Sequence, residues 1–296
     1  AGKLFGIPVA GTHAHSWVMN FPNEYEAFLA YAELFPDACL LLVDTYDTLR
    51  SGVPNAIKVF DILRSKGHEP KGIRLDSGDL AYLSKQARKM LDDAGDPDAI
   101  ICASGDLDEY LITSLKNQGA KIDLWGVGTK LITSADMPAL GGVYKLSALY
   151  PKEGGEIPKI KLSDNSDKIT NPAFKDVFRI YDNKTGKAEA DLIVVRGEEI
   201  DESKPLTVFH PKETWKKTTF TDYTVRPLTV KVMEKGRLVY KLPSLKEISA
   251  YAEKEKESFW DEYKRLDNPH VYKVDLSQRL YDIKNSLISE IRSKNG

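Results

Sequence analysis

The chain has 296 residues, of which 42% are hydrophobic and 29% are charged, enough for one large or two ordinary domains with a substantial core. The net charge of −2 gives no electrostatic case for binding nucleic acid or an anionic membrane. No apolar run reaches the roughly 20 residues that a membrane-spanning helix needs, and the first segment lacks the charged start and cleavage site of a signal peptide. We therefore predict a cytoplasmic globular protein with no nucleic-acid partner and no membrane partner. Two cysteines inside apolar runs, Cys39 and Cys102, suit buried thiols in a reducing compartment.

An apolar run at residues 4–10 predicts a strand that stops at Gly11 and then presents two histidines, His13 and His15. If this segment is extended, both imidazoles lie on one face, so a metal pair is conceivable. A hydrogen-bonded pair at a strand end is the favoured alternative. No other His or Cys supplies a third metal ligand at a telling spacing.

Next come four units in which a short apolar strand is followed by a helical pattern or a Gly-rich turn. The first helix begins at the cap Asn23 and ends before Pro36. The predicted strands are residues 39–43, 71–75, 99–103 and 121–125, and the helices between them are residues 55–66, 80–94 and 108–117. Alternation of this kind indicates a parallel sheet, and short units without a Rossmann glycine fingerprint favour a barrel. We predict an irregular parallel α/β barrel.

Polar and glycine residues follow the predicted strands directly. They are Asp44, Arg74 and Asp76, residues 104–106 (Ser-Gly-Asp), and residues 126–129 (Gly-Val-Gly-Thr). In a parallel barrel these strand ends share one face, where phosphate sites commonly lie in Gly-rich turns after late strands. The glycines could equally serve only to permit tight turns. The aspartates could hold magnesium or ribose hydroxyls, or act as turn residues and helix caps, as at Asp79 and Asp108.

Several blocks together resemble one enzyme family. They are residues 11–17 (GTHAHSW), 42–48 (LVDTYDT), 74–80 (RLDSGDL), 126–129 (GVGT) and 141–146 (GGVYKL). In this order they resemble the nicotinate phosphoribosyltransferases over about residues 1–180, from the middle of the catalytic barrel onward. The resemblance implies a type II phosphoribosyltransferase barrel and an enzyme of ligase or glycosyltransferase type that works as a homodimer in the NAD salvage pathway. The implied reaction is ATP-assisted condensation of nicotinate with phosphoribosyl pyrophosphate to nicotinate mononucleotide and pyrophosphate, with ATP and Mg²⁺ as cofactors.

The resemblance also implies roles for individual residues. It makes His15 the residue that ATP phosphorylates, and Asp76 the group that stabilises the cationic ribosyl transition state or a magnesium ion. Substrate-binding roles fall on Thr12 and Arg74 for nicotinate, and on Gly126, Gly128 and Thr129 for the phosphoribosyl phosphate. From their places at the strand ends, we also expect Ser104 and Gly105 to bind substrate and Asp44 to be a metal ligand. For Arg74, a guanidinium fork suits a carboxylate, and a salt bridge in the barrel mouth is the alternative.

The resemblance also implies a longer protein, because members of that family have a further N-terminal portion of more than a hundred residues. The alternative interpretation is therefore a non-catalytic fragment or subunit that needs such a portion, and we expect little turnover from this chain alone. We expect three segments: residues 1–149 as the barrel portion, 150–242 as a β-rich continuation and 243–296 as a helical tail. In the tail, Ser244 with Glu247 predicts a capping box, and Asp275 is predicted to open the last helix.

Overall fold

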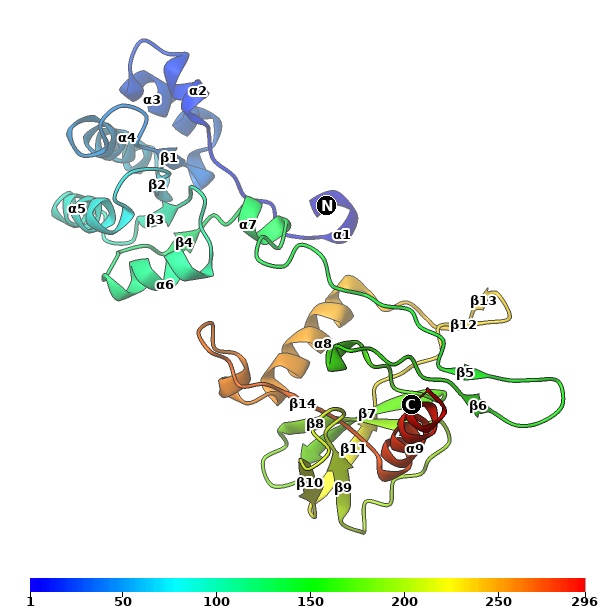
Figure 1. Cartoon of the computed structure of the whole chain (residues 1–296). Coiled ribbons are helices and arrows are strands. Elements are labelled where there is room, and N and C mark those ends of the chain that lie inside the picture. The colour runs from blue at the N-terminus through cyan, green and yellow to red at the C-terminus, as the bar shows by residue number, and fades with distance from the viewer. Residues whose placement is uncertain (296) are drawn as a thin grey trace. The chain divides into compact units, whose positions relative to one another are not determined.

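The computed structural model describes residues 1–295, apart from the side chains of residues 167 and 295, and divides into two compact units, Ala1–Gly141 and Gly142–Gly296 (Figure 1). The first unit contains, in chain order, α1 (Gly2–Phe5), α2 (His15–Met19), α3 (Glu24–Leu34), η1 (Pro36–Ala38), β1 (Leu40–Leu42), η2 (Thr48–Gly52), α4 (Val53–Ser65), β2 (Gly72–Leu75), α5 (Leu80–Asp93), β3 (Ile100–Ala103), α6 (Glu109–Asn117), β4 (Leu124–Trp125) and α7 (Thr129–Ile132). The predicted alternation of strands and helices is confirmed.

The four strands form a parallel sheet in the order β1-β2-β3-β4. Leu41, Ile73 and Ile101 lie side by side in the register and are fully buried against one core. The same core contains side chains of α3 to α6, so these helices cover one face of the sheet, as Figure 1 shows for α4 and α5. Within the described residues β1 and β4 are the two edges, so the structure gives an α/β sheet and does not show a closed barrel.

Short polar side chains start the helices that follow the strands. Asn23, Asp79 and Asp108 each accept a hydrogen bond from the backbone amide three residues further on, which satisfies one of the unpaired donors of the first turn. These caps confirm the sequence interpretation. Gly52 is the last residue of η2 and packs against the backbone just after β1. A β-carbon at this position would lie 1.8 Å from the carbonyl oxygen of Val43, so only glycine fits.

The opening segment differs from its prediction. Residues 4–10 are not a strand, because α1 takes Gly2–Phe5 and the following residues have no regular structure. Val9 is 85% exposed, and no strand in the described part of the chain pairs with this run. Helix α2 begins at His15, so the two histidines do not share one face of a strand.

The second unit is built on a six-stranded mixed sheet in the order β10-β9-β14-β8-β7-β11. Its strands are β5 (Ala148–Leu149), β6 (Ile157–Pro158), β7 (Lys175–Asp182), β8 (Ala188–Val195), β9 (Leu206–Phe209), β10 (Lys217–Phe220), β11 (Tyr223–Pro227), β12 (Met233–Glu234), β13 (Arg237–Leu238) and β14 (Lys273–Leu276). Its helices are η3 (Ser166–Lys168), α8 (Leu245–Ser258), η4 (Asp261–Tyr263) and α9 (Gln278–Asn295). The structure thus joins into one unit what the sequence suggested as two segments, 150–242 and 243–296.

The end of the chain shows one correct and one wrong prediction. The capping box at α8 is confirmed, because the side chains of Ser244 and Glu247 each bond the other's backbone amide. Asp275 does not open the last helix: it lies in β14, which runs parallel to β8. The hydroxyl of Ser277 accepts from the amide of Leu280 and caps α9 instead.

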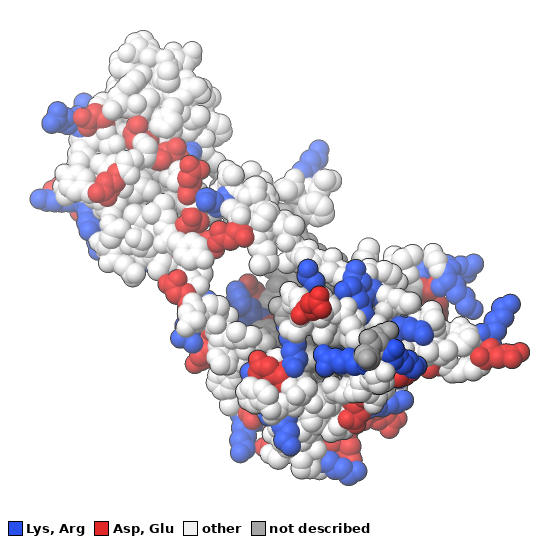
Figure 2. Space-filling view, viewed as in Figure 1, with Lys and Arg blue, Asp and Glu red and all other residues white. Residues whose placement is uncertain are grey.

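Charges of both signs are interspersed on the face of the molecule drawn in Figure 2, in keeping with the small net charge. Cys39 and Cys102 are buried and unpaired, as predicted. Burial raises the pKa of the Cys39 thiol to about 12. Among the described helices, none has the length and apolar character needed to cross a bilayer.

Candidate active site

The carboxyl ends of three neighbouring strands bring their polar side chains to one edge of the sheet. Asp44 follows β1, Asp76 follows β2 and Ser104 follows β3. The strands are parallel and in consecutive order, so these residues lie side by side. The first residue of α2, His15, reaches the same edge, and four residues far apart in sequence meet there.

The imidazole of His15 faces two carboxylates. Its Nε2 lies 3.9 Å from Oδ2 of Asp76 and 4.0 Å from Oδ1 of Asp44. Its Nδ1 lies 3.1 Å from the hydroxyl oxygen of Thr45. The side chain is 40% exposed, so a substrate could reach the ring.

The side chain of Asp44 is almost completely buried, at 2% exposed. Its Oδ2 accepts hydrogen bonds from the amide of Asp76 (2.9 Å) and the hydroxyl of Ser77 (2.7 Å), which fixes the turn after β2. Its Oδ1 is buried and has no hydrogen-bond partner among the described residues. A buried carboxylate oxygen without a donor is unfavourable, and Nε2 of His15, at 4.0 Å, is too far away to donate a hydrogen bond to it.

Arg74, Asp76 and Ser104 form a closed set of hydrogen bonds across β2 and β3. Nη2 of Arg74 donates to Oδ1 of Asp76 (2.7 Å), its Nε donates to Oγ of Ser104 (2.7 Å), and that hydroxyl donates to the same Oδ1. Partial burial disfavours the charged form of Asp76, but the bonds from Ser104 and Arg74 outweigh it and hold the pKa of Asp76 below its ordinary value. The carboxylate is therefore ionised at neutral pH.

The glycines of the turns after β3 and β4 differ in what surrounds them. Gly105 has φ +96°, and a β-carbon there would lie 2.2 Å from the carbonyl oxygen of Asp76, so the turn after β3 packs directly on the turn after β2. The amide of Gly126 donates to the carbonyl of Ala103 (2.7 Å) and extends the sheet. Gly128 and Thr129 lie exposed at the start of α7, with open space around Gly128.

Thr12 and His13 are engaged with β1. The hydroxyl of Thr12 donates to the carbonyl of Leu40 (2.5 Å), and the amide of Leu42 donates to Nε2 of His13 (3.1 Å). His13 is buried, with its ring edge-on to Tyr31 at 4.8 Å. Burial lowers the pKa of His13 to about 4, so the ring is neutral and acts as a hydrogen-bond acceptor. The favoured alternative, a hydrogen-bonded histidine, describes this residue.

The chain is similar in sequence to known proteins of one family. Residues 174–284 match the family model described as the nicotinate phosphoribosyltransferase C-terminal domain. The chain is 48% identical over 294 residues to the nicotinate phosphoribosyltransferase of Bacillus subtilis, and 32% identical over 340 residues to that of Homo sapiens. These matches cover 99% and 97% of the chain.

Two solved structures are also similar. The crystal structure of human nicotinic acid phosphoribosyltransferase superposes with a TM-score of 0.76 at 28% identity, over 97% of this chain and 63% of that one. The nicotinate-nucleotide pyrophosphorylase of Pyrococcus furiosus, with a TM-score of 0.59 at 19% identity over 87% of this chain and 57% of that one, shows a shared fold.

The chain resembles the nicotinate phosphoribosyltransferases. It spans 59% of the length of the Bacillus subtilis relative and 62% of the human one. The sequence motifs had already indicated this family from the first part of the chain, and the family model adds the second unit.

Two polar contacts of this nicotinate phosphoribosyltransferase-like site were not predicted individually. Thr45 and Ser77 lie in the blocks that carry the resemblance, directly after Asp44 and Asp76, but their contacts depend on how two turns meet. Among the described residues no group of three or more His, Cys, Asp or Glu side chains is arranged to hold a metal. The site instead offers two carboxylates, from Asp44 and Asp76.

Proposed function

We propose that the chain carries the site at which nicotinate is joined to phosphoribosyl pyrophosphate, giving nicotinate mononucleotide and pyrophosphate for NAD salvage, with ATP phosphorylating His15. The observation that carries this proposal is the position of the His15 ring, 3.9–4.0 Å from two carboxylates and still exposed. The relatives named as nicotinate phosphoribosyltransferases support the reaction class.

The contacts of His15 suggest how its ring would react. The two carboxylates near Nε2 favour a proton on that nitrogen, and Nδ1 then keeps its lone pair and accepts from the hydroxyl of Thr45. In the phosphorylation step the hydroxyl of Thr45 gives up its bond to Nδ1, and the bond from Nδ1 to the γ-phosphorus forms while the bond from that phosphorus to the departing ADP oxygen breaks. Asp44 and Asp76 stabilise the cationic ring that results.

Arg74 and Asp76 suit the second step, the transfer of the ribosyl group. The ring nitrogen of nicotinate bonds to ribosyl C1 as the bond from C1 to pyrophosphate breaks, and the ionised carboxylate of Asp76 stabilises the positive charge that develops. Arg74 is one-quarter exposed, and its guanidinium would bind the nicotinate carboxylate. Ser104, Gly105, Gly126, Gly128 and Thr129 would bind the phosphoribosyl group.

Magnesium fits the donor set. Mg²⁺ in phosphoryl-transfer sites is commonly held by one or two carboxylates together with substrate phosphates. Asp44 has a buried oxygen without a partner, and Asp76 lies beside it. Bound there, the ion would neutralise phosphate charge.

The sheet also suits one sector of a closed barrel. Consecutive strand order with the core helices on one face is the arrangement of a barrel wall, and Arg74 and Cys102 would then face the interior. We further propose that the active form is a homodimer, which sedimentation velocity of the purified chain would test.

The proposal is tested with ATP, Mg²⁺, phosphoribosyl pyrophosphate and radiolabelled nicotinate. We expect γ-labelled ATP to label His15, as mapped under alkaline conditions, and His15→Ala to lose the label. His68→Ala is the matched control, because His68 is a surface histidine that pairs with Asp37. Label on His13, or label that survives in His15→Ala, would contradict the assignment.

The same assay tests whether the chain needs a further polypeptide. If ATP labels His15 but no nicotinate mononucleotide forms, the result would support the proposed phosphorylation step. It would also support our expectation of little turnover by residues 1–296 alone. Full turnover by this chain would contradict that expectation.

A further inference from the structure

Glu24 is a buried carboxylate that the proposed reaction does not use. It is the first residue of α3, directly after the cap Asn23, and is only 2% exposed. One oxygen, Oε2, accepts a hydrogen bond from the hydroxyl of Ser51. The other, Oε1, is buried without a partner in the described part of the chain. Burial raises the pKa of Glu24, and burying a carboxyl group is unfavourable unless hydrogen bonds such as that from Ser51 compensate it.

The partner of Glu24 belongs to the loop that carries Asp44. Residues 44–52 leave the end of β1, place Asp44 and Thr45 against His15, and return through η2, a single π-helical turn. Turns of this kind are rare and occur frequently at functional sites. The loop closes on itself, because Gly52 packs on the carbonyl of Val43. Ser51 therefore lies at the returning end of the segment that faces His15.

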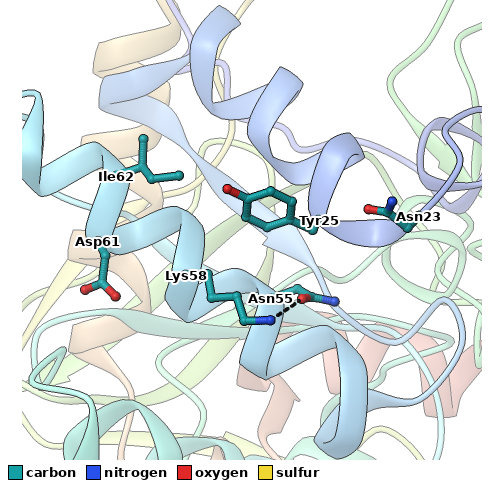
Figure 3. A pocket seen from close by; sticks show the side chains of 6 residues that line it. All are labelled: Asn23, Tyr25, Asn55, Lys58, Asp61 and Ile62. Atoms are coloured by element: carbon teal, nitrogen blue, oxygen red, sulfur yellow. Dashed lines mark hydrogen bonds between the residues drawn. The ribbon is translucent and has the colours of Figure 1, made fainter.

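The contact continues from Ser51 into α4. Asn55 donates to the hydroxyl of Ser51 (3.4 Å) and accepts from Nζ of Lys58 (3.3 Å). Figure 3 shows Asn55 and Lys58 in a pocket between α4 and the start of α3, where Asn23 and Tyr25 lie. Three elements, α3, η2 and α4, are thus joined by polar groups behind the loop.

Glu24 and His15 lie on the same short stretch of chain. Helix α2 begins at His15, and α3 begins at Glu24 after a tight connection. The loop is therefore held to this stretch at two points: Thr45 contacts His15, and Ser51 contacts Glu24. The bonds of Asp44 to the turn after β2 hold the start of the loop, and the contacts of Thr45 and Ser51 hold the rest of it, so the loop cannot shift relative to the imidazole without breaking one of these contacts.

We propose that Glu24 is a positioning residue, whose hydrogen bond to Ser51 sets the loop of residues 44–52 so that Asp44 and Thr45 meet His15. Glu24 acts through Ser51 and does not touch the reacting atoms. The effect on activity rests on the proposed function of His15, whereas the geometry of the loop does not.

The test uses the full chain with ¹³C-labelled histidine, and variants Glu24→Ala, Ser51→Ala, the double variant and Glu24→Gln. The first readout is the ring resonance of His15 at pH 7, with His68 as internal reference. We expect the two single alanine variants to shift His15 in the same direction and the double variant to add little to Glu24→Ala, because the one contact that Ser51→Ala removes is among those that Glu24→Ala removes, together with the interactions of Glu24 with Asn55 and the backbone of Tyr46. Glu24→Gln keeps an acceptor for Ser51 and should restore the resonance. Glu33→Ala, an exposed glutamate further along α3, is the matched control and should leave it unchanged.

The second readout is the rate at which ATP labels His15. We expect Glu24→Ala and Ser51→Ala to slow it roughly 10- to 100-fold, the scale of a misplacement of about 1 Å, and Glu24→Gln to recover most of the rate. If Glu24→Ala does not fold, Ser51→Ala decides, since it removes only a hydroxyl. An unshifted His15 resonance in folded Ser51→Ala would overturn the proposal, as would additive effects. If the variants shift the His15 resonance but ATP labels neither the variants nor the natural chain, the positioning role of Glu24 is upheld and the proposed function is refuted.

Discussion

Each unit contains a pair of oppositely charged residues on neighbouring parts of a sheet, and the two pairs are bonded very differently. In the second unit Arg179 donates to both oxygens of Asp191, at 2.8 and 3.1 Å, and the two side chains are about 15% exposed. In the first unit Arg74 makes one bond to Asp76, at 2.7 Å, and the two side chains are 25% and 29% exposed.

Arg179 donates through all three of its nitrogens to carboxylates of the second unit. Glu255 of α8 accepts from its Nη1 (3.0 Å), Phe259 stacks on the guanidinium at 4.7 Å, and Tyr272 donates to Asp191 (3.1 Å). Such a set fixes α8 to the sheet. At the other pair, Asp76 keeps one oxygen facing His15. The comparison teaches that a carboxylate with both oxygens bonded to its arginine holds structure, whereas one that bonds its arginine through a single oxygen keeps the other for a further group.

The largest effect is expected where the bonded set is broken. Asp191→Asn should lower the free energy of unfolding of the second unit by up to about 3–5 kcal/mol, because it removes the carboxylate that accepts two bonds from Arg179 and leaves Glu255, which also pairs with Arg226, as the remaining anionic partner of two cations. Urea unfolding followed by circular dichroism measures the change. Asp176→Asn is the control, since its partner Arg196 is half exposed and the pair should contribute less than about 1 kcal/mol. Equal losses of unfolding free energy in the two variants would show that burial does not decide how much each ion pair contributes.

The second prediction contrasts the two histidines of the first unit. Burial lowers the pKa of His13 from 6.5 to about 4, so the unfolded chain binds a proton in this range before the folded chain does. The free energy of unfolding therefore keeps its full value with respect to His13 above pH 6.5 and falls as the pH is lowered to 4. The expected loss is about 3 kcal/mol, at roughly 1.4 kcal/mol per pKa unit.

Urea unfolding at pH 7, 5.5 and 4 measures this loss. His13→Gln keeps an acceptor for the amide of Leu42 and should remove most of the pH dependence. His68→Gln, at the surface, should keep it. A His13→Gln variant that loses stability with acid as steeply as the natural chain would assign the effect to other groups.

The parts of the fold that could be predicted are those set by neighbouring residues. Apolar runs ending in Asp44, Asp76 and Ser104 predicted parallel strands with their polar ends at one edge, and the structure brings these ends together. The failures depended on distant partners. Residues 273–276 become β14 because β8, about 80 residues earlier, lies beside them, and nothing local signals that pairing.

The site divides in the same way. The grouping of Arg74 and Asp76 could be predicted from their places at a strand end, because such ends face a common edge, whereas the roles expected of His15, Arg74 and Asp76 came from the family resemblance. The separate role of His13 could not be read from a His-x-His spacing, since it follows from the turn into α2 at Ala14 and from burial against Tyr31. The role of Ser51 depends on a buried contact across 27 residues.

A third prediction tests the open pair directly. Arg74→Ala should weaken nicotinate binding by about 1.5–3 kcal/mol, the range for a hydrogen bond to a charged group, and change nicotinamide binding little. Isothermal titration calorimetry with both ligands measures the difference. Because Arg74 is partly exposed, the variant should remain folded by circular dichroism. Equal losses for the two ligands would show that Arg74 holds the site together and does not read the carboxylate.

The smallest effect is expected at a pair that is neither fully bonded nor part of a site. Lys66 and Glu33 approach to 3.8 Å, and their side chains are 52% and 59% exposed. Water screens such a pair, so Glu33→Ala should change the free energy of unfolding by less than about 0.5 kcal/mol, and the change should vanish in high salt. Urea unfolding at low salt and at 0.5 M salt measures it. A loss comparable to that of Asp191→Asn would mean that opposite charge alone, and not the number of bonds made around it, decides what a pair contributes.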